Sequence, residues 1–158
     1  MIKLPRNTFL MLADMDLDKF QSIQRRGQQP RWLPGDHEDA DGHGYFAYEA
    51  LLMIIANKIF ECTALDRNEA KTLVEHDPNG PMRFVLEPGE SQFVGVVSFM
   101  NSYELACGTY EEVLSGFEDL KKNWREEFNW GTIFDVSVEF KNLMDHLEDA
   151  GIKILRNA

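Results

Sequence analysis

The charged side chains of this chain are unevenly distributed, and their placement limits the chemistry that each part can perform. The 158 residues carry a net charge of −11. Residues 1–33 nevertheless hold six basic and three acidic residues, a net +3, so the remaining residues carry −14. Binding to nucleic acid depends largely on basic side chains that neutralise phosphates. Only the N-terminal segment could supply this chemistry, through Lys3, Arg6, Lys19, Arg25, Arg26 and Arg31.

Other reactive side chains do not form a motif for catalysis or metal binding. His37 and His43 stand among four carboxylates within residues 36–41, but their spacing matches neither a calcium loop nor a zinc site, so an acidic, solvated loop is the interpretation. Adjacent carboxylates such as Glu111 and Glu112 point to different sides of a helix and form no acid–base pair. The chain also lacks a nucleophile motif and a glycine-rich phosphate loop. We expect no catalytic residue, no metal, no cofactor and no enzymatic activity.

The cysteines and the hydropathy of the chain bear on its compartment. Cys62 and Cys107 are isolated thiols and are interpreted as buried, small apolar residues, with a disulfide left open. No apolar run reaches transmembrane length, and residues 1–6 contain no signal-peptide core. The sequence therefore predicts a cytoplasmic protein that does not engage a membrane.

Hydrophobic periodicity predicts a helical N-terminal half. Thr8 is the expected cap of a first short helix, and Asp16 of a second over residues 17–26, which Gly27 ends. After a polar loop, residues 47–62 form a helix that is apolar on most sides. Asp66 starts one more helix, which reaches about residue 76.

The pattern changes after the break at residues 77–81. Residues 83–87 and 92–100 predict a β-hairpin, residues 103–107 a further strand, and Thr109 the cap of a helix. Trp124 and Trp130 either close the C-terminal core or mark a partner site. The fold class is therefore predicted as α+β, with a helical winged-helix-like domain at residues 1–77 and a small α+β domain at residues 82–158.

Two segments of the N-terminal half resemble a known family. The helix ends in Arg25-Arg26-Gly27 with Pro30 beyond it, and after a loop Gly44-Tyr45-Phe46-Ala47-Tyr48 leads into the apolar helix. The order and spacing resemble the winged helix-turn-helix domain of MerR transcription regulators over residues 8–76. In that family the helix is a recognition helix, and the loop, here residues 28–44, is a wing.

The resemblance implies that residues 17–26 enter the major groove of DNA. By position in the motif, Lys19, Arg25 and Arg26 would contact phosphates. Gln21, Ser22 or Gln24 could then read base edges. The residues that the resemblance assigns to DNA binding are Lys19, Gln21, Ser22, Gln24, Arg25, Arg26 and Arg31. It also implies a bacterial or prophage regulator whose C-terminal part serves in dimerisation or sensing.

Three departures from the family pattern support an alternative. The helix-turn-helix is about three residues shorter, the wing is acidic, and Phe46 replaces an arginine that would contact phosphate. The alternative is an acidic protein-interaction module, of antitoxin, immunity or DNA-mimic type, on a degenerate winged-helix scaffold. The apolar surface of the helix at residues 47–62 is wider than a single packing face, so it needs a second partner, either the C-terminal domain or a second subunit. We expect a homodimer.

Overall fold

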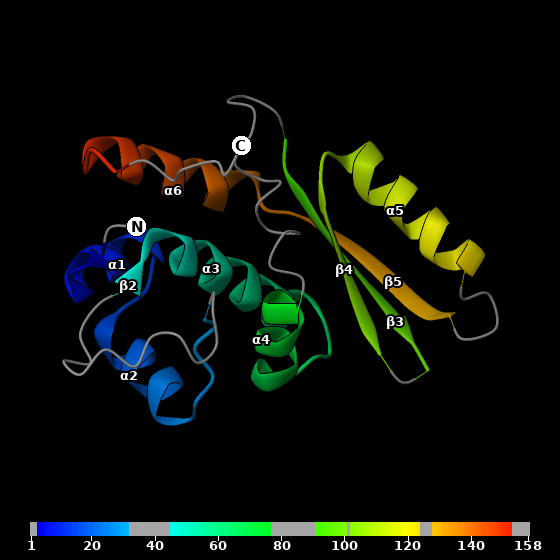
Figure 1. The fold of residues 1–158 in the computed structure, drawn as a ribbon, viewed down its shortest axis with the longest axis horizontal. Coiled ribbons are helices and arrows are strands. Elements are labelled where there is room, and N and C mark those ends of the chain that lie inside the picture. The colour runs from blue at the N-terminus through cyan, green and yellow to red at the C-terminus, as the bar shows by residue number, and fades with distance from the viewer. Residues whose placement is uncertain (1–2, 32–44, 77–90, 101, 124–127, 153–158) are drawn as a thin grey trace.

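The chain folds into a helical N-terminal half and a C-terminal half built on a three-stranded sheet (Figure 1). This computed structural model describes residues 3–31, 45–76, 91–100, 102–123 and 128–152. The predicted α+β class is confirmed, with the helical part first and a β-hairpin following it. None of the described helices is both long and apolar enough to cross a bilayer.

Four helices and a two-residue strand pair make up the N-terminal half. The first two helices are joined by a tight turn, in which Asp14 adopts a left-handed conformation with φ of 48°. Strands β1 and β2 pair antiparallel, with Leu4 opposite Tyr45. The elements are β1 Lys3–Leu4, α1 Arg6–Leu12, α2 Leu17–Arg25, β2 Tyr45–Phe46, α3 Ala47–Cys62 and α4 Arg67–His76.

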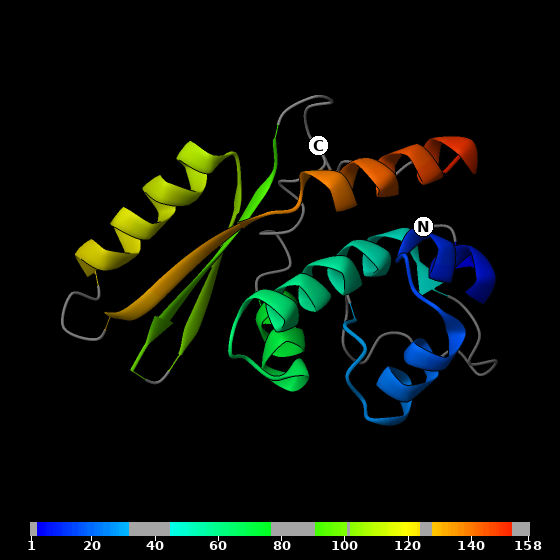
Figure 2. The same ribbon diagram turned by 180° about the vertical axis from the view of Figure 1, so that it is seen from behind.

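In the C-terminal half, α5 covers one face of an antiparallel sheet whose strand order is β4-β3-β5. Val96 in the central strand lies opposite Leu105 of one neighbour and Thr132 of the other. After the last strand, α6 leaves the sheet and runs alongside α3, as Figure 2 shows from behind. The elements are β3 Phe93–Phe99, β4 Tyr103–Gly108, α5 Tyr110–Asn123, β5 Phe128–Asp135 and α6 Ser137–Asp149.

Helix α3 is the centre of the hydrophobic core. It packs against α1, α4 and α6, so its apolar side chains are covered within the chain. Ile54 and Ile55 are only 8% and 1% exposed. Of the two covers expected from the sequence, the C-terminal half supplies one through α6. The apolar surface of α3 therefore gives no further support to the homodimer, which stays a prediction.

The two faces of the sheet pack against different partners because successive side chains of a strand alternate. Val94 and Val96 face the N-terminal core, where they join the same cluster as Leu143 of α6. Gly95 faces α5 instead, beneath Val113 and Phe117. One cluster of buried residues thus runs through both halves. The proposed boundary at residues 77–82 lies outside the described residues, and the division into two domains stays a prediction.

Several local expectations are confirmed. Asp16 caps α2, where its carboxylate accepts the backbone N–H of Lys19 at 2.7 Å. Glu112 and Thr109 form the expected reciprocal cap of α5, and Asp66 and Glu69 form that of α4.

Other local expectations are wrong. The first helix begins at Arg6 after Pro5, whose φ of −60° already suits a helix start, so Thr8 lies inside the helix and does not cap it. The hairpin partner of β3 is β4, while residues 83–87 lie outside the described residues. Cys62, the last residue of α3, is exposed where the sequence predicted burial; Cys107 is buried as expected, and neither cysteine forms a disulfide.

Candidate nucleic-acid interface

Helix α2 is held against α1 by a small aromatic cluster. The rings of Phe9 and Phe20 lie 5.4 Å apart, and both contact the ring of Tyr45 from β2. Phe20 and Ile23 are buried, three residues apart on the inner side of α2. The short turn before α2 therefore still allows the first helix to support the second. This packing leaves the opposite side of α2 toward solvent.

The solvent side of α2 carries most of the candidate DNA-binding residues. At 100° per residue, positions 18, 21, 22 and 25 fall on the side away from the buried pair, and positions 19 and 26 lie along one edge of that side. Lys19, Arg25 and Arg26 are exposed, whereas Gln21 and Ser22 are half-buried. Arg25 donates from Nε to the backbone carbonyl of Gln21 at 3.3 Å. The exposed side of α2 thus carries Arg25 together with Gln21 and Ser22, whereas Lys19 lies on the flank that meets α3 and α6.

Gln24 lies on a different side of α2. Its amide nitrogen donates to Oε1 of Gln29 and to the hydroxyl of Tyr45, both at 3.0 Å. Its N–H groups are therefore engaged inside the chain. Helical position alone did not reveal this, since both partners lie outside α2.

Arg31 is also separate from the exposed face of α2. Its backbone N–H donates to Oε1 of Glu75 at 2.7 Å, and its guanidinium lies 3.9 Å from Oε1 of Glu49. Glu49 is fully buried, and its second oxygen accepts the backbone N–H of Phe46. Phe46 is itself buried and belongs to the core. The Arg31 contacts fasten the chain beyond α2 to α3 and α4.

Two basic residues of α4, absent from the sequence-based set, lie near the C-terminal end of α2. Lys71 donates from Nζ to the backbone carbonyl of Gly27 at 2.9 Å. Burial lowers the pKa of Arg67, and the positive charge of Arg26 lowers it further, against an opposing effect of Glu61. Arg67 also lies over the ring of Phe60, 4.1 Å from its centroid. Sequence separation of more than 40 residues hides this proximity, which arises only when α4 packs beside α2.

Acidic groups surround this basic region. Asp18 is exposed on α2, and Glu75 lies between Lys71 and Arg31. Burial raises the pKa of Glu75, while the N–H of Arg31 and the charge of Lys71 oppose that shift. The acidic loop and its two histidines lie outside the described residues. Within the part of the chain that the structure describes, no three histidine, cysteine or acidic side chains gather as metal ligands.

Two pockets lie elsewhere on the described surface. One, of about 150 Å³, lies where Asp14 and Lys19 meet α3 and α6, beside the ion pair of Lys58 and Glu139. The other, of about 360 Å³, is an open hollow lined by Glu118, Lys121, Lys122 and Phe128.

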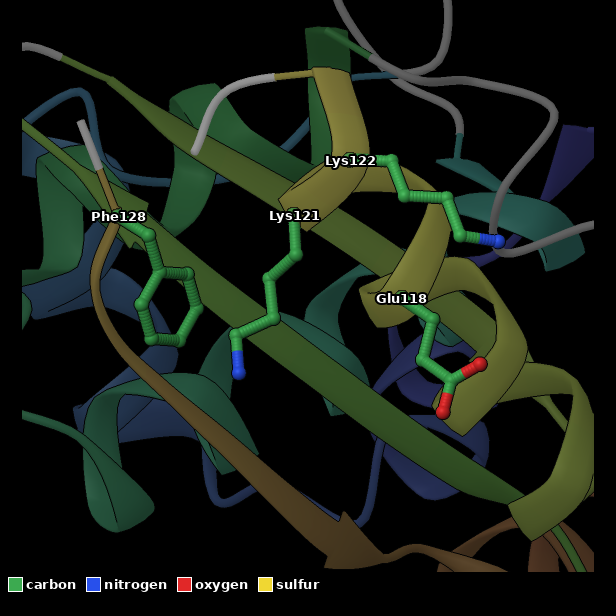
Figure 3. A pocket seen from close by; sticks show the side chains of 4 residues that line it. All are labelled: Glu118, Lys121, Lys122 and Phe128. Carbon is green, nitrogen blue, oxygen red and sulfur yellow. The ribbon is translucent and has the colours of Figure 1, made fainter. Parts of the chain in front are cut away.

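Figure 3 shows Lys121 pointing toward the ring of Phe128, whose centroid is 4.7 Å from the amine, while Glu118 and Lys122 point elsewhere. This hollow has the character of an exposed cation–aromatic contact, and its side chains converge on no common point.

Comparison with known proteins gives no relative from which a function could be carried over. No protein-family model matches the chain, and no curated protein matches it. The functional argument therefore rests on the residues and their arrangement alone.

Proposed function

We propose that this chain is a DNA-binding transcription regulator of MerR-like winged-helix type, bacterial or prophage in origin and cytoplasmic, with α2 as its recognition helix. The observation that carries the proposal is the outer side of α2. It presents Arg25 with Asp18, Gln21 and Ser22, has Lys19 and Arg26 along one edge, and is fixed on its inner side by Phe20 and Ile23. A rigid helix that carries cations beside polar groups suits major-groove binding.

The roles within this interface follow from the chemistry of each side chain. The three cations would contact phosphates, which sets affinity without reading sequence. Ser22 and Gln21 would reach base edges, which sets specificity. Arg67 of α4 extends the same basic margin beyond the end of α2. A homodimer reading two half-sites belongs to the proposal, and sedimentation of the free chain and of its DNA complex tests that part.

Charge reversal tests the proposal directly. The variant Arg25→Glu with Arg26→Glu is compared with wild type on genomic DNA fragments, by gel shift and anisotropy at several salt concentrations. We expect weaker binding to all sequences and a salt slope lower by about one unit for each lost phosphate contact. The control is Lys122→Glu with Lys141→Glu, which makes the same change in net charge at exposed sites on α5 and α6. Equal effects of the two variants, or an unchanged slope in the first, would exclude phosphate contact by the arginines.

The net charge of −11 favours a second candidate function, an acidic protein-interaction module on the same scaffold. Exposed carboxylates such as Glu111, Glu112 and Asp119 line the outer side of α5. A basic protein partner would suit this surface through complementary charge. The two candidates differ in the gel shift: a module of this kind binds no fragment even at low salt.

A further inference from the structure

We infer that Gln24 and Tyr45 form a clamp that sets the orientation of the recognition helix, and that Gln24 acts as a positioning residue and does not read bases. The inference rests on the proposed DNA-binding function and assigns a different role to one residue of that site. The clamp joins the last turn of α2 to β2, the strand that follows the wing. It consists of Gln24, Gln29 and Tyr45.

Hydrogen-bond capacity argues against base reading by Gln24. A glutamine that reads adenine uses its amide nitrogen as donor and its amide oxygen as acceptor at once. The Gln24 nitrogen has two N–H groups, and it donates to two acceptors within the chain. Contact with a base would require breaking at least one of these bonds.

The geometry of Tyr45 suits a role in orientation. Its ring stacks on Phe9 of α1, with centroids 4.6 Å apart, and meets Phe20 of α2 at an angle of 71°. Its backbone is paired with Leu4 in β1. The hydroxyl is thus held by α1 and β1 as well as by Phe20, so its bond to Gln24 restrains rotation of α2 about its own axis.

The burial of the Gln29 amide indicates that the clamp does more than stabilise the fold. It is 5% exposed, and its own amide nitrogen lacks an acceptor among the described residues. A buried polar group with an unused donor is costly compared with an apolar side chain of similar shape. Holding Gln24 in one rotamer accounts for an amide at this position.

Contacts from α4 fix the chain just beyond the clamp. Lys71 donates to the carbonyl of Gly27, and Glu75 accepts the backbone N–H of Arg31. The C-terminal end of α2 is therefore restrained from two sides, by β2 through Tyr45 and by α4. Loss of the Tyr45 hydrogen bond should therefore allow α2 to rotate about its axis, while the contacts from α4 still hold its C-terminal end in place.

Two conservative variants test the clamp. Tyr45→Phe keeps the ring and removes the hydroxyl, and Gln24→Leu keeps the approximate size and removes the amide. In the free protein, we expect backbone amide exchange in α2 to become about fivefold faster in each variant, the factor expected for loss of one hydrogen bond. Exchange in α5 should stay unchanged. If amide exchange in α2 is unchanged in both variants, the clamp does not exist, whether or not the protein binds DNA.

DNA selection then separates positioning from reading. With a random-sequence library, both variants should lower the ratio of specific to non-specific affinity several-fold while keeping the same preferred base at every position. The double variant should be no worse than the weaker-binding single variant, because both changes break the same bond. Val113→Ala, at a buried residue of α5, controls for a general loss of stability.

The results that would contradict the inference differ from those that would contradict the proposed function. If Gln24→Leu changes the preferred base at one position and Tyr45→Phe does not, Gln24 is a reader and the inference is wrong. Gln21→Leu supplies the reference for what loss of a reader looks like. If the wild-type chain binds no DNA, the proposed function fails and the orienting role toward DNA fails with it, while the exchange data alone decide whether the clamp exists.

Discussion

At the scale of single residues, most of the buried charge lies around the segment that follows α2. Glu49 is fully buried, with one oxygen bound to the Phe46 N–H and the other facing the Arg31 guanidinium. Glu75 accepts the Arg31 N–H from the opposite side. Oε1 of Glu49 has no hydrogen-bond partner among the described residues, so the Arg31 guanidinium at 3.9 Å is the charge that opposes the cost of its burial. These contacts tie the chain beyond α2 to α3 and α4, and their stability should depend on pH.

The pH dependence can be predicted from Glu75. Burial raises its folded-state pKa above the ordinary value of 4.5. The folded state therefore binds the proton more tightly than the unfolded state, so this group favours folding at low pH. That contribution falls as pH rises from about 4.5 through the raised pKa. We expect Glu75→Gln, which keeps an oxygen acceptor for Arg31, to flatten stability against pH in that window and to leave stability near pH 7 equal or slightly higher.

Urea unfolding between pH 4 and pH 8 measures this effect. Glu111→Gln, a change at an exposed carboxylate on α5, is the matched control and should leave the curve unchanged. A clear loss of stability at pH 7 in Glu75→Gln would show that attraction to Lys71 and Arg31 outweighs the cost of burying the charge.

At the scale of elements, α5 approaches the sheet closely because two strand glycines leave space for it. A Cβ at Gly95 would lie 2.5 Å from Val113 and Phe117, and one at Gly131 would lie 2.9 Å from Phe117. Both glycines face α5 from neighbouring strands, so Phe117 lies across the sheet where side chains are absent. This close approach explains why glycine occupies the middle of the central strand, where it is otherwise unfavourable.

A pair of glycine substitutions tests this packing. Gly95→Ala should lower the free energy of unfolding by about 1–3 kcal/mol, since the new methyl group displaces α5. Gly116→Ala, on α5 itself, places its Cβ at an ordinary 3.4 Å from Ala106, and alanine favours a helix over glycine by about 1 kcal/mol. It should be neutral or stabilising. Chemical denaturation of both variants gives the comparison, and equal stability of Gly95→Ala and wild type would contradict the close approach.

At the scale of the whole molecule, α6 joins the two halves. It follows directly from β5, yet Leu143 and Leu147 are buried in the cluster that contains α1 and α3. Its first turn is linked to the start of the sheet through Ser137 and Gln92, and to α3 through the ion pair of Lys58 and Glu139. The halves therefore share a core, and we expect them to unfold together.

Leu143→Ala tests the shared core. Leu143 has no exposed surface, so its truncation should cost about 2–5 kcal/mol. Val138→Ala on the same helix, at a residue that is 69% exposed, should change stability by less than about 0.5 kcal/mol. Unfolding is followed by helix circular dichroism and by the fluorescence of Trp130 in β5, in a background where Trp32 and Trp124 are replaced by phenylalanine. Both signals should shift to lower denaturant together, and a shift in only one of them would mean that the halves are independent.

The sequence by itself determined the local features of this protein. Caps at Asp16, Asp66 and Thr109 were predictable, because each depends on a side chain three residues from the backbone group that it binds. The α+β class and the apolar helix were predictable for a similar reason, since periodicity and turn residues are local signals. The start of the first helix was missed because Pro5 and Thr8 both suit that role locally.

Only the tertiary structure decided how distant residues meet. It brought Tyr45 to Gln24, Glu75 to Arg31 and Arg26 close to Arg67, across separations of 21 to 44 residues. It also placed α6 over α3, which covers an apolar surface that the sequence leaves open to either a second subunit or the chain itself. Helical spacing fixes which side a residue occupies but not what packs there. Long-range packing therefore made Gln24, from the sequence a candidate to contact DNA, a residue held within the fold.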